Sequence, residues 1–186
     1  MKVCTITGYK PFEIGVFGEK DIKLQLIKTV LKKRLIQLME DGLEWVLISG
    51  QMGTEIWAAQ VVFELQEIGF PIQLAVITPF KDPHLNWNEK NQMMMEEIII
   101  GADYYESLSN RPYESPSQFR TKDIFFLKKS DGALIFYDSD NEGSPKYFLD
   151  LAKKYQENHE YEIQLIDFYE ITALADELQD NINSQF

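Results

Sequence analysis

The feature of this sequence that most constrains its fold is a regular alternation of short β-rich runs with longer stretches of helical periodicity. Such an alternation favours parallel strands joined by right-handed helical crossovers. The predicted strands lie at residues 3–7, 44–49, 72–78, 103–106, 131–137 and 162–167, and the predicted helices at about 21–39, 56–68, 88–100, 119–129 and 145–157, before a short helical tail. We therefore expect an α/β fold of Rossmann-like type, with a doubly wound, mostly parallel sheet and helices on both faces.

Length and composition fit one domain with one core. Of the 186 residues, 45% are hydrophobic and 26% are charged, and no linker, internal repeat or low-complexity tract divides the chain. We expect a single domain over residues 1–186. The formal net charge of −12 repels phosphate backbones, which argues against general nucleic-acid binding. A local basic pocket can still hold one phosphorylated ligand, because short-range donors decide such a site.

The sequence lacks the motifs that would indicate a membrane protein, a disulfide-bonded protein or several common kinds of active site. No apolar run reaches the length of a membrane span, and the one cysteine, Cys4, lies in a predicted strand, so we expect a cytoplasmic protein without disulfides. Neither a G-x-G-x-x-G segment nor a P-loop follows a strand, and no cluster of metal-ligating residues is present. His84 and His159 occupy loop-like and helix-end positions that do not suit a catalytic relay. We name no cofactor and no metal.

The loop after the second predicted strand carries the strongest binding signal. Ligands of doubly wound sheets bind beyond the carboxyl ends of the strands. Gly50 and Gly53 would let the backbone approach a ligand there, with the amides of the next helix available to an anion. Glu55 has two interpretations, a structural acid in the first helical turn or an acceptor for a ribose hydroxyl or base. The candidate binding residues of this loop are Gly50, Gln51, Gly53, Thr54 and Glu55.

Two further loops are candidates at the same edge of the sheet. In the first, Gly8 would supply backbone freedom, while Tyr9 and Lys10 would be available for stacking and charge; a solvated surface lysine is the alternative. In the third, Asp138 would orient the loop or a ligand hydroxyl. Gly143 and Ser144 would contact a phosphate or ribose at a helix start, or serve only as a good helix start.

Arginine and tryptophan side chains add weaker candidates. Arg111 offers planar, always-charged donors for phosphate or carboxylate, but a surface salt bridge is the favoured interpretation of both Arg111 and Arg120. Trp57 and Trp87 could stack on a base, but core positions are the favoured interpretation for both.

Taken together, five ordered segments resemble the YpsA family of Firmicutes over nearly the whole chain. They are TGYKPF (7–12), SGQMGTEIWAA (49–59), ITPF (77–80), RPYESP (111–116) and GSPKY (143–147). That family belongs to the SLOG superfamily, a Rossmann-like group that includes the DNA-processing protein DprA and the cytokinin-activating LOG enzymes. The resemblance implies a nucleotide or ADP-ribose-like ligand, with Gly53 and Glu55 at key pocket positions. It also implies a link to cell division and stress responses.

The leading functional hypothesis is a ligand-binding sensor in which nucleotide occupancy alters a surface facing a protein partner. The alternative is a LOG-like hydrolase of a nucleotide N-glycosidic bond, with Glu55 stabilising positive charge on the ribose or activating water. LOG enzymes carry P-G-G-x-G-T followed by a glutamate, whereas this chain has EGSPKY at 142–147 and no acid until Asp150. A DprA-like DNA-binding module is disfavoured by the acidic balance. Ligand identity and oligomeric state stay open.

Overall fold

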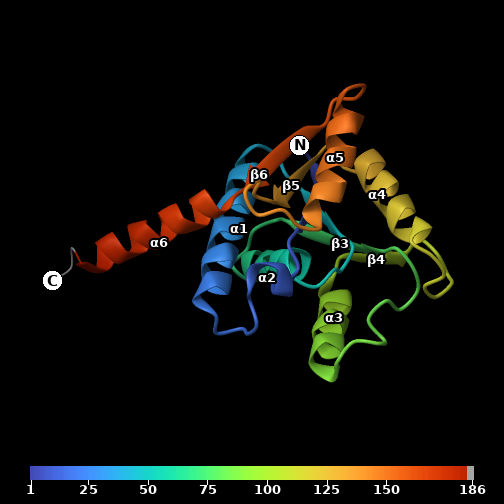
Figure 1. Cartoon of the computed structure of the whole chain (residues 1–186), viewed down its shortest axis with the longest axis horizontal. Helices are drawn as coiled ribbons and strands as arrows, with labels where there is room; N and C mark the ends of the chain where they lie inside the picture. Colours follow the sequence, from blue (N-terminus) through green and yellow to red (C-terminus); the bar gives the residue numbers. More distant parts are fainter. Residues whose placement is uncertain (184–186) are drawn as a thin grey trace.

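The structure, a computed structural model, contains one six-stranded sheet in the order β4-β3-β2-β1-β5-β6, with every neighbouring pair parallel (Figure 1). It describes residues 1–183, and side chains as far as residue 180. The expected doubly wound parallel sheet is confirmed. Its elements are β1 (Val3–Gly8), η1 (Pro11–Ile14), α1 (Ile22–Glu40), β2 (Trp45–Ile48), α2 (Thr54–Glu67), β3 (Gln73–Thr78), α3 (Glu89–Gly101), β4 (Tyr104–Ser107), α4 (Ser117–Lys129), β5 (Gly132–Phe136), α5 (Pro145–Gln156), β6 (Glu162–Ile166) and α6 (Phe168–Asn183).

The direction in which the chain adds new strands to the sheet reverses between β1 and β5. The chain moves outward from β1 to β4 on one side, then returns across β1 to add β5 and β6 on the other. In register, Thr5 lies opposite Leu47 of β2 and Ala133 of β5. The carboxyl ends of β1 and β5 therefore lie side by side, with Gly8 opposite Phe136. This pair is the topological switch point, where doubly wound folds commonly bind ligands.

Helices cover both faces of the sheet, as expected. On one face α2 contacts α1, α3 and strands β1 to β3, and on the other α4 contacts α5, which packs on β5 and β6 (Figure 1). A sheet covered on both faces needs strands that are apolar almost throughout. All five residues of β5 are buried, which explains why its sequence shows no polar alternation.

The structure shifts several predicted boundaries. α2 begins at Thr54 rather than at residue 56, because Gly53 is its N-cap, and η1 was not expected. The predicted short tail is the 16-residue α6. Its first half packs on α1 through buried Ile171 and an ion pair between Arg34 and Glu170 at 2.9 Å. Its second half extends away from the rest of the molecule (Figure 1).

Candidate functional site

A cavity of about 700 Å³ lies at the carboxyl edge of the sheet, over the ends of β1, β2 and β3. One wall is the segment after β1 that includes η1, and the other is the segment after β3 together with the start of α3. The β2 loop forms the floor, and α4 contributes two side chains. The lining residues are Lys10, Pro11, Phe12, Val16, Phe17, Gly18, Glu19, Leu24, Ser49, Gly50, Gln51, Met52, Trp57, Pro79, Phe80, Pro83, Trp87, Asn88, Lys90, Asn91, Met94, Phe119 and Lys122.

The cavity lining combines aromatic surface with basic side chains. Trp57, Trp87 and Phe80 all line it, so both tryptophans, for which core positions were favoured, have a surface on the cavity. Trp57 is at the same time 5% exposed and part of the core of α2. Three lysines and one glutamate line the cavity, and their balance is basic although the whole chain carries −12. Such a lining suits an aromatic or heterocyclic ligand that carries negative charge.

The β2 loop is shaped by two glycines with positive φ angles. Gly50 has φ 84° and Gly53 has φ 104°, values that side chains other than glycine rarely adopt. A Cβ at Gly53 would lie 2.4 Å from the carbonyl oxygen of Tyr9, so the β1 and β2 loops touch there. Gly50 and Gln51 line the cavity, and the backbone amide of Gly50 donates no hydrogen bond within the described part of the chain.

The carboxylate of Glu55 is bound by the protein itself. One oxygen accepts from the Thr7 hydroxyl at 2.9 Å. The other accepts from the amide and hydroxyl of Ser49, both at 2.8 Å, and from the Gln51 amide at 3.1 Å. Glu55 is 2% exposed and is absent from the cavity lining. The structure therefore places it as an acid that holds the β2 loop, which fits the structural interpretation rather than contact with a ribose hydroxyl or base.

The β1 loop divides between the protein interior and the cavity. Tyr9 is fully buried, and its ring stacks with Tyr137 and Phe168 at centroid distances of 6.1 and 5.8 Å. This placement corrects the expectation that Tyr9 is available to stack on a ligand. Lys10, by contrast, lines the cavity, and its ammonium group forms no ion pair with any described residue.

The contacts of Gly8 and Thr54 explain why small residues are needed at this junction. The Thr54 amide and hydroxyl both donate to the Tyr9 carbonyl at 3.1 Å. A Cβ at Gly8 would meet the Thr54 hydroxyl oxygen at 2.5 Å and Phe136 at 2.8 Å. Neither Gly8 nor Thr54 lines the cavity, so both bring the β1 loop against α2 without facing a ligand.

The β5 loop lies outside the cavity and bonds to the β1 loop. The Ser144 amide and hydroxyl donate to the two carboxylate oxygens of Glu13 at 2.7 and 2.8 Å, and the Lys10 amide donates to Glu13 at 2.6 Å. Burial alone would raise the pKa of Glu13, but these hydrogen bonds outweigh it and hold the pKa below its ordinary value. A Cβ at Gly143 would meet the Tyr9 ring at 2.8 Å. Gly143 and Ser144 thus face η1 and Tyr9.

Asp138 is also engaged within the protein. Its two carboxylate oxygens accept from the amides of Asp140, at 2.9 Å, and Phe168, at 3.1 Å. Its own amide donates to the Tyr9 hydroxyl at 2.9 Å, and that hydroxyl donates to the carbonyl of Asn141. The carboxylate of Asp138 thus bonds within its own loop and to the start of α6, and Asp138 does not line the cavity.

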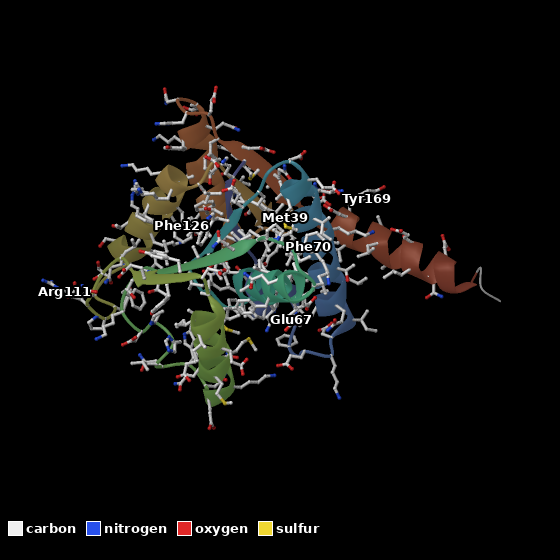
Figure 2. All side chains as sticks on the ribbon, turned by 180° about the vertical axis from the view of Figure 1, so that it is seen from behind. Met39, Glu67, Phe70, Arg111, Phe126 and Tyr169 are labelled. Carbon is white, nitrogen blue, oxygen red and sulfur yellow. The ribbon has the colours of Figure 1, made fainter. Side chains whose placement is uncertain are left out.

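Arg111 lies at the surface, away from the cavity. Its side chain is 74% exposed, pairs with Glu114 at 3.5 Å and points outward at the edge of the molecule (Figure 2). Arg120 is exposed as well, and neither arginine lines the cavity. The surface salt bridge is therefore the better interpretation of Arg111.

Sequence reasoning missed several lining residues. Phe80, Asn88, Lys90 and Lys122 come from the β3 exit, α3 and α4. The position of Phe80 directly after a strand was an available signal, whereas Lys122 gives none, because it belongs to a helix predicted only as a sheet cover. His84, beside Trp87, is 6% exposed, and its Nδ1 has no hydrogen-bond partner among the described residues.

Two searches of the described residues bear on other kinds of site. No helix in residues 1–183 is both long and apolar enough to cross a membrane. No group of three or more histidine, cysteine or acidic residues in that part of the chain is placed to hold a metal ion.

The chain closely matches proteins of one bacterial family. The family model YpsA, described as the YspA SLOG family, matches residues 4–171. A UPF0398 protein of Bacillus licheniformis is 51% identical over 177 residues, which cover 95% of this chain and 97% of that protein. The UPF0398 protein YpsA of Bacillus subtilis is 49% identical over 177 residues, covering 95% and 98%.

A solved structure has the same fold. DNA processing protein A from Helicobacter pylori, reported for its single-stranded DNA binding mode, aligns with a TM-score of 0.52 and 14% identity over 96% of this chain and 81% of that one. At this identity the likeness supports the Rossmann-like fold alone. The match of the family model and the near full-length relatives together show that the chain belongs to the YpsA family of SLOG proteins.

Proposed function

We propose that this protein binds a nucleotide-like small molecule, a mononucleotide or an ADP-ribose-like compound, in the cavity over β1, β2 and β3, and that it acts as a sensor. The observation that carries the proposal is the cavity itself. At about 700 Å³ it falls within the size range of small-molecule sites, and it lies at the carboxyl edge of a doubly wound sheet.

The lining supplies a group for each part of such a ligand. Trp57 and Trp87 offer aromatic surface for a base. Lys10 offers a positive charge without an ion-pair partner among the described residues, and the unbonded amide of Gly50 lies in the same lining. Lys90 and Lys122 are already paired, with Glu19 at 3.1 Å and with Asp123. Lys10 is thus the lysine we expect to meet the anionic group.

The placement of the acids favours binding over hydrolysis. Hydrolysis of an N-glycosidic bond needs a carboxylate that reaches the ribose or an attacking water. Glu55 is turned into the β2 loop, and Glu19, the one acid among the described residues of the lining, pairs with Lys90 at the rim. A regulatory role, with the link to cell division and stress responses that the family resemblance implies, fits a site of this kind, and it would involve a protein partner. The acidic balance still argues against general nucleic-acid binding.

Tryptophan fluorescence tests the proposal directly. The protein is titrated with AMP, GMP, CMP, UMP and ADP-ribose, and we expect at least one to quench the emission and raise the melting temperature. Trp57→Phe and Trp87→Phe should weaken the quenching. Trp45→Phe is the matched control, because Trp45 begins β2 at the opposite edge of the sheet. The proposal fails if no compound changes either signal.

A base-release assay on the same samples separates the two hypotheses. A sensor leaves the ligand intact, whereas a hydrolase releases free base. Release by the parent that persists in a heat-denatured blank would be chemical background, and release lost in folded Glu55→Gln would favour the hydrolase over the proposal.

A further inference from the structure

The start of α5 is closed by a carboxylate from another part of the chain. Glu13 lies in η1, 131 residues before Ser144. It nevertheless receives three hydrogen bonds, two from Ser144 and one from the Lys10 amide, all between 2.6 and 2.8 Å. These donors come from two different loops and converge on one anion. Charge-assisted bonds of this length are the contacts that a bound phosphate or carboxylate makes in proteins.

The first three residues of α5 offer few backbone donors to a ligand. Pro145, the first residue of the helix, has no N–H group. The amides of Lys146 and Tyr147 bond to the carbonyls of Gly143 and Ser144, at 3.2 and 3.3 Å. A ligand phosphate that used the Ser144 amide and hydroxyl would therefore have to displace Glu13.

The contact between Glu13 and Ser144 lies where it can affect how a ligand binds. It lies at the switch point between β1 and β5, where a doubly wound fold would be expected to hold the phosphates of a ligand. Here the Tyr9 ring fills the interior of that crevice, in edge contact with Phe136 at 5.1 Å, and Glu13 covers its polar rim. The cavity is displaced to the other side, over β1, β2 and β3.

We propose that the Glu13 carboxylate is an internal substitute for a ligand phosphate, which fills the anion site at the switch point and directs the phosphate of a bound nucleotide toward Lys10. Glu13 is in this sense a specificity-determining residue that does not touch the ligand. The direction of the phosphate rests on the proposed function. The existence of an anion site filled by Glu13 does not, since it concerns the protein without ligand.

Anion rescue of a truncated variant tests the site. Glu13→Ala should lower the melting temperature, and acetate or inorganic phosphate should recover about half or more of that loss by binding the three donors. Sodium chloride at matched ionic strength controls for screening. Glu142→Ala is the matched control variant, because Glu142 is exposed in the same loop and, in the part of the chain that the structure describes, pairs with Lys146 alone. We expect no anion-specific recovery in Glu142→Ala or in the parent.

Two outcomes would overturn the anion site. Acetate and phosphate could stabilise Glu13→Ala no more than sodium chloride does, or they could stabilise the parent equally. If Glu13→Ala does not fold, Glu13→Ser serves instead. Its short side chain also vacates the space in front of the three donors, so recovery by the same anions is the expected result, and none would count against the site.

Titration with AMP then tests whether the phosphate of a bound nucleotide lies near Lys10. AMP should bind the parent equally well with and without acetate, whereas Lys10→Ala should weaken it by about tenfold, the worth of one charge-assisted contact. Loss of AMP affinity in acetate would show that the phosphate uses the switch point and would overturn the assignment. Failure of every nucleotide to bind the parent would overturn the proposed function and leave the rescue result standing.

Discussion

The starts of α2 and α5 differ in where their carboxylate comes from. At α2 the acid is Glu55, which belongs to the helix itself and bonds to the loop immediately before it while 98% hidden from solvent. At α5 the acid is Glu13, which arrives from a distant segment and stays half-buried. The first arrangement shapes a loop whose outer side still lines the cavity. The second bonds its loop to η1, and none of the described residues of that loop lines the cavity.

A glycine-containing loop before a helix therefore does not by itself make a ligand site. Gly53 and Gly143 both allow a close approach, but the approaching group at Gly53 is the backbone of the β1 loop and at Gly143 is the Tyr9 ring. Of these two loops, the one after β2 contributes residues to the cavity lining, Gly50 among them, and the described residues of the loop after β5 do not. Four substitutions test whether the two helix starts differ in this way.

Glu55→Ala should have the largest effect on stability. It would leave the donors of Thr7, Ser49 and Gln51 buried without an acceptor, which we expect to lower the free energy of unfolding by about 3–5 kcal/mol. Urea denaturation measures the change. Glu67→Ala, at the exposed end of the same helix, is the control and should cost less than about 0.5 kcal/mol. Equal stability of the two variants would contradict a structural role for Glu55.

Gly53→Ala should rank second. The residue would have to adopt φ 104° and place its Cβ 2.4 Å from the Tyr9 carbonyl oxygen, so we expect a loss of about 2–3 kcal/mol. Gly69→Ala is a matched control with φ 93° and no atom within 4 Å of the new Cβ. It should lose only about 1 kcal/mol, the cost of the backbone conformation alone. If both variants lose the same amount, the contact between the β1 and β2 loops adds nothing.

Glu13→Gln should have a smaller effect that depends on pH. The pKa of Glu13 is lower in the folded chain than its ordinary value of 4.5, so its charge stabilises the fold fully above about pH 4.5, and this contribution disappears as the pH falls through the lowered pKa. At pH 7 we expect a loss of about 1 kcal/mol, reduced by partial exposure. Urea denaturation of parent and variant at pH 7 and pH 3 should show the difference shrinking. A difference that grows at pH 3 would refute the contact.

Arg111→Ala should have the smallest effect. An exposed ion pair such as that with Glu114 contributes about 0.5 kcal/mol or less, and the side chain lies away from the cavity. Calorimetric titration with whichever nucleotide binds the parent should give an affinity within about twofold of the parent value. A tenfold loss would restore Arg111 as a ligand contact.

The fold could be predicted from the sequence because its signals are local and periodic. Runs such as 72–78 and 131–137 are nearly continuous in apolar residues, which distinguishes covered parallel strands, and the glycines that follow the strands indicated the correct edge of the sheet. The candidate site was predicted in part, through Lys10, Gly50 and Gln51, which line the cavity. These residues follow directly from the rule that loops at strand ends bind ligands.

The remaining features depend on contacts between residues far apart in the sequence, which leave no periodic signal. Nothing near Ser144 indicates that its donors are taken by Glu13, and nothing near Tyr9 indicates that its hydroxyl bonds to a loop 129 residues later. Glu55 looked available for a ligand because its partners Thr7 and Ser49 were predicted only as strand ends. The contact of Trp57 with the cavity could not be predicted either, because the sequence does not indicate what lies against that face of α2.

The buried Tyr9 hydroxyl also decides which wall of the cavity can move. The hydrogen bonds of this hydroxyl and of Glu13 connect the β1 and β5 loops. We therefore expect the opposite wall, residues 81–88, to move when the cavity opens for a ligand. That segment holds Asp82 at φ 49° and His84, whose Nδ1 has no hydrogen-bond partner among the described residues, and we expect both to lower the cost of rearrangement. Amide hydrogen exchange should therefore be fast across 81–88 and slow at Asp138, and a bound nucleotide should slow the former without altering the latter.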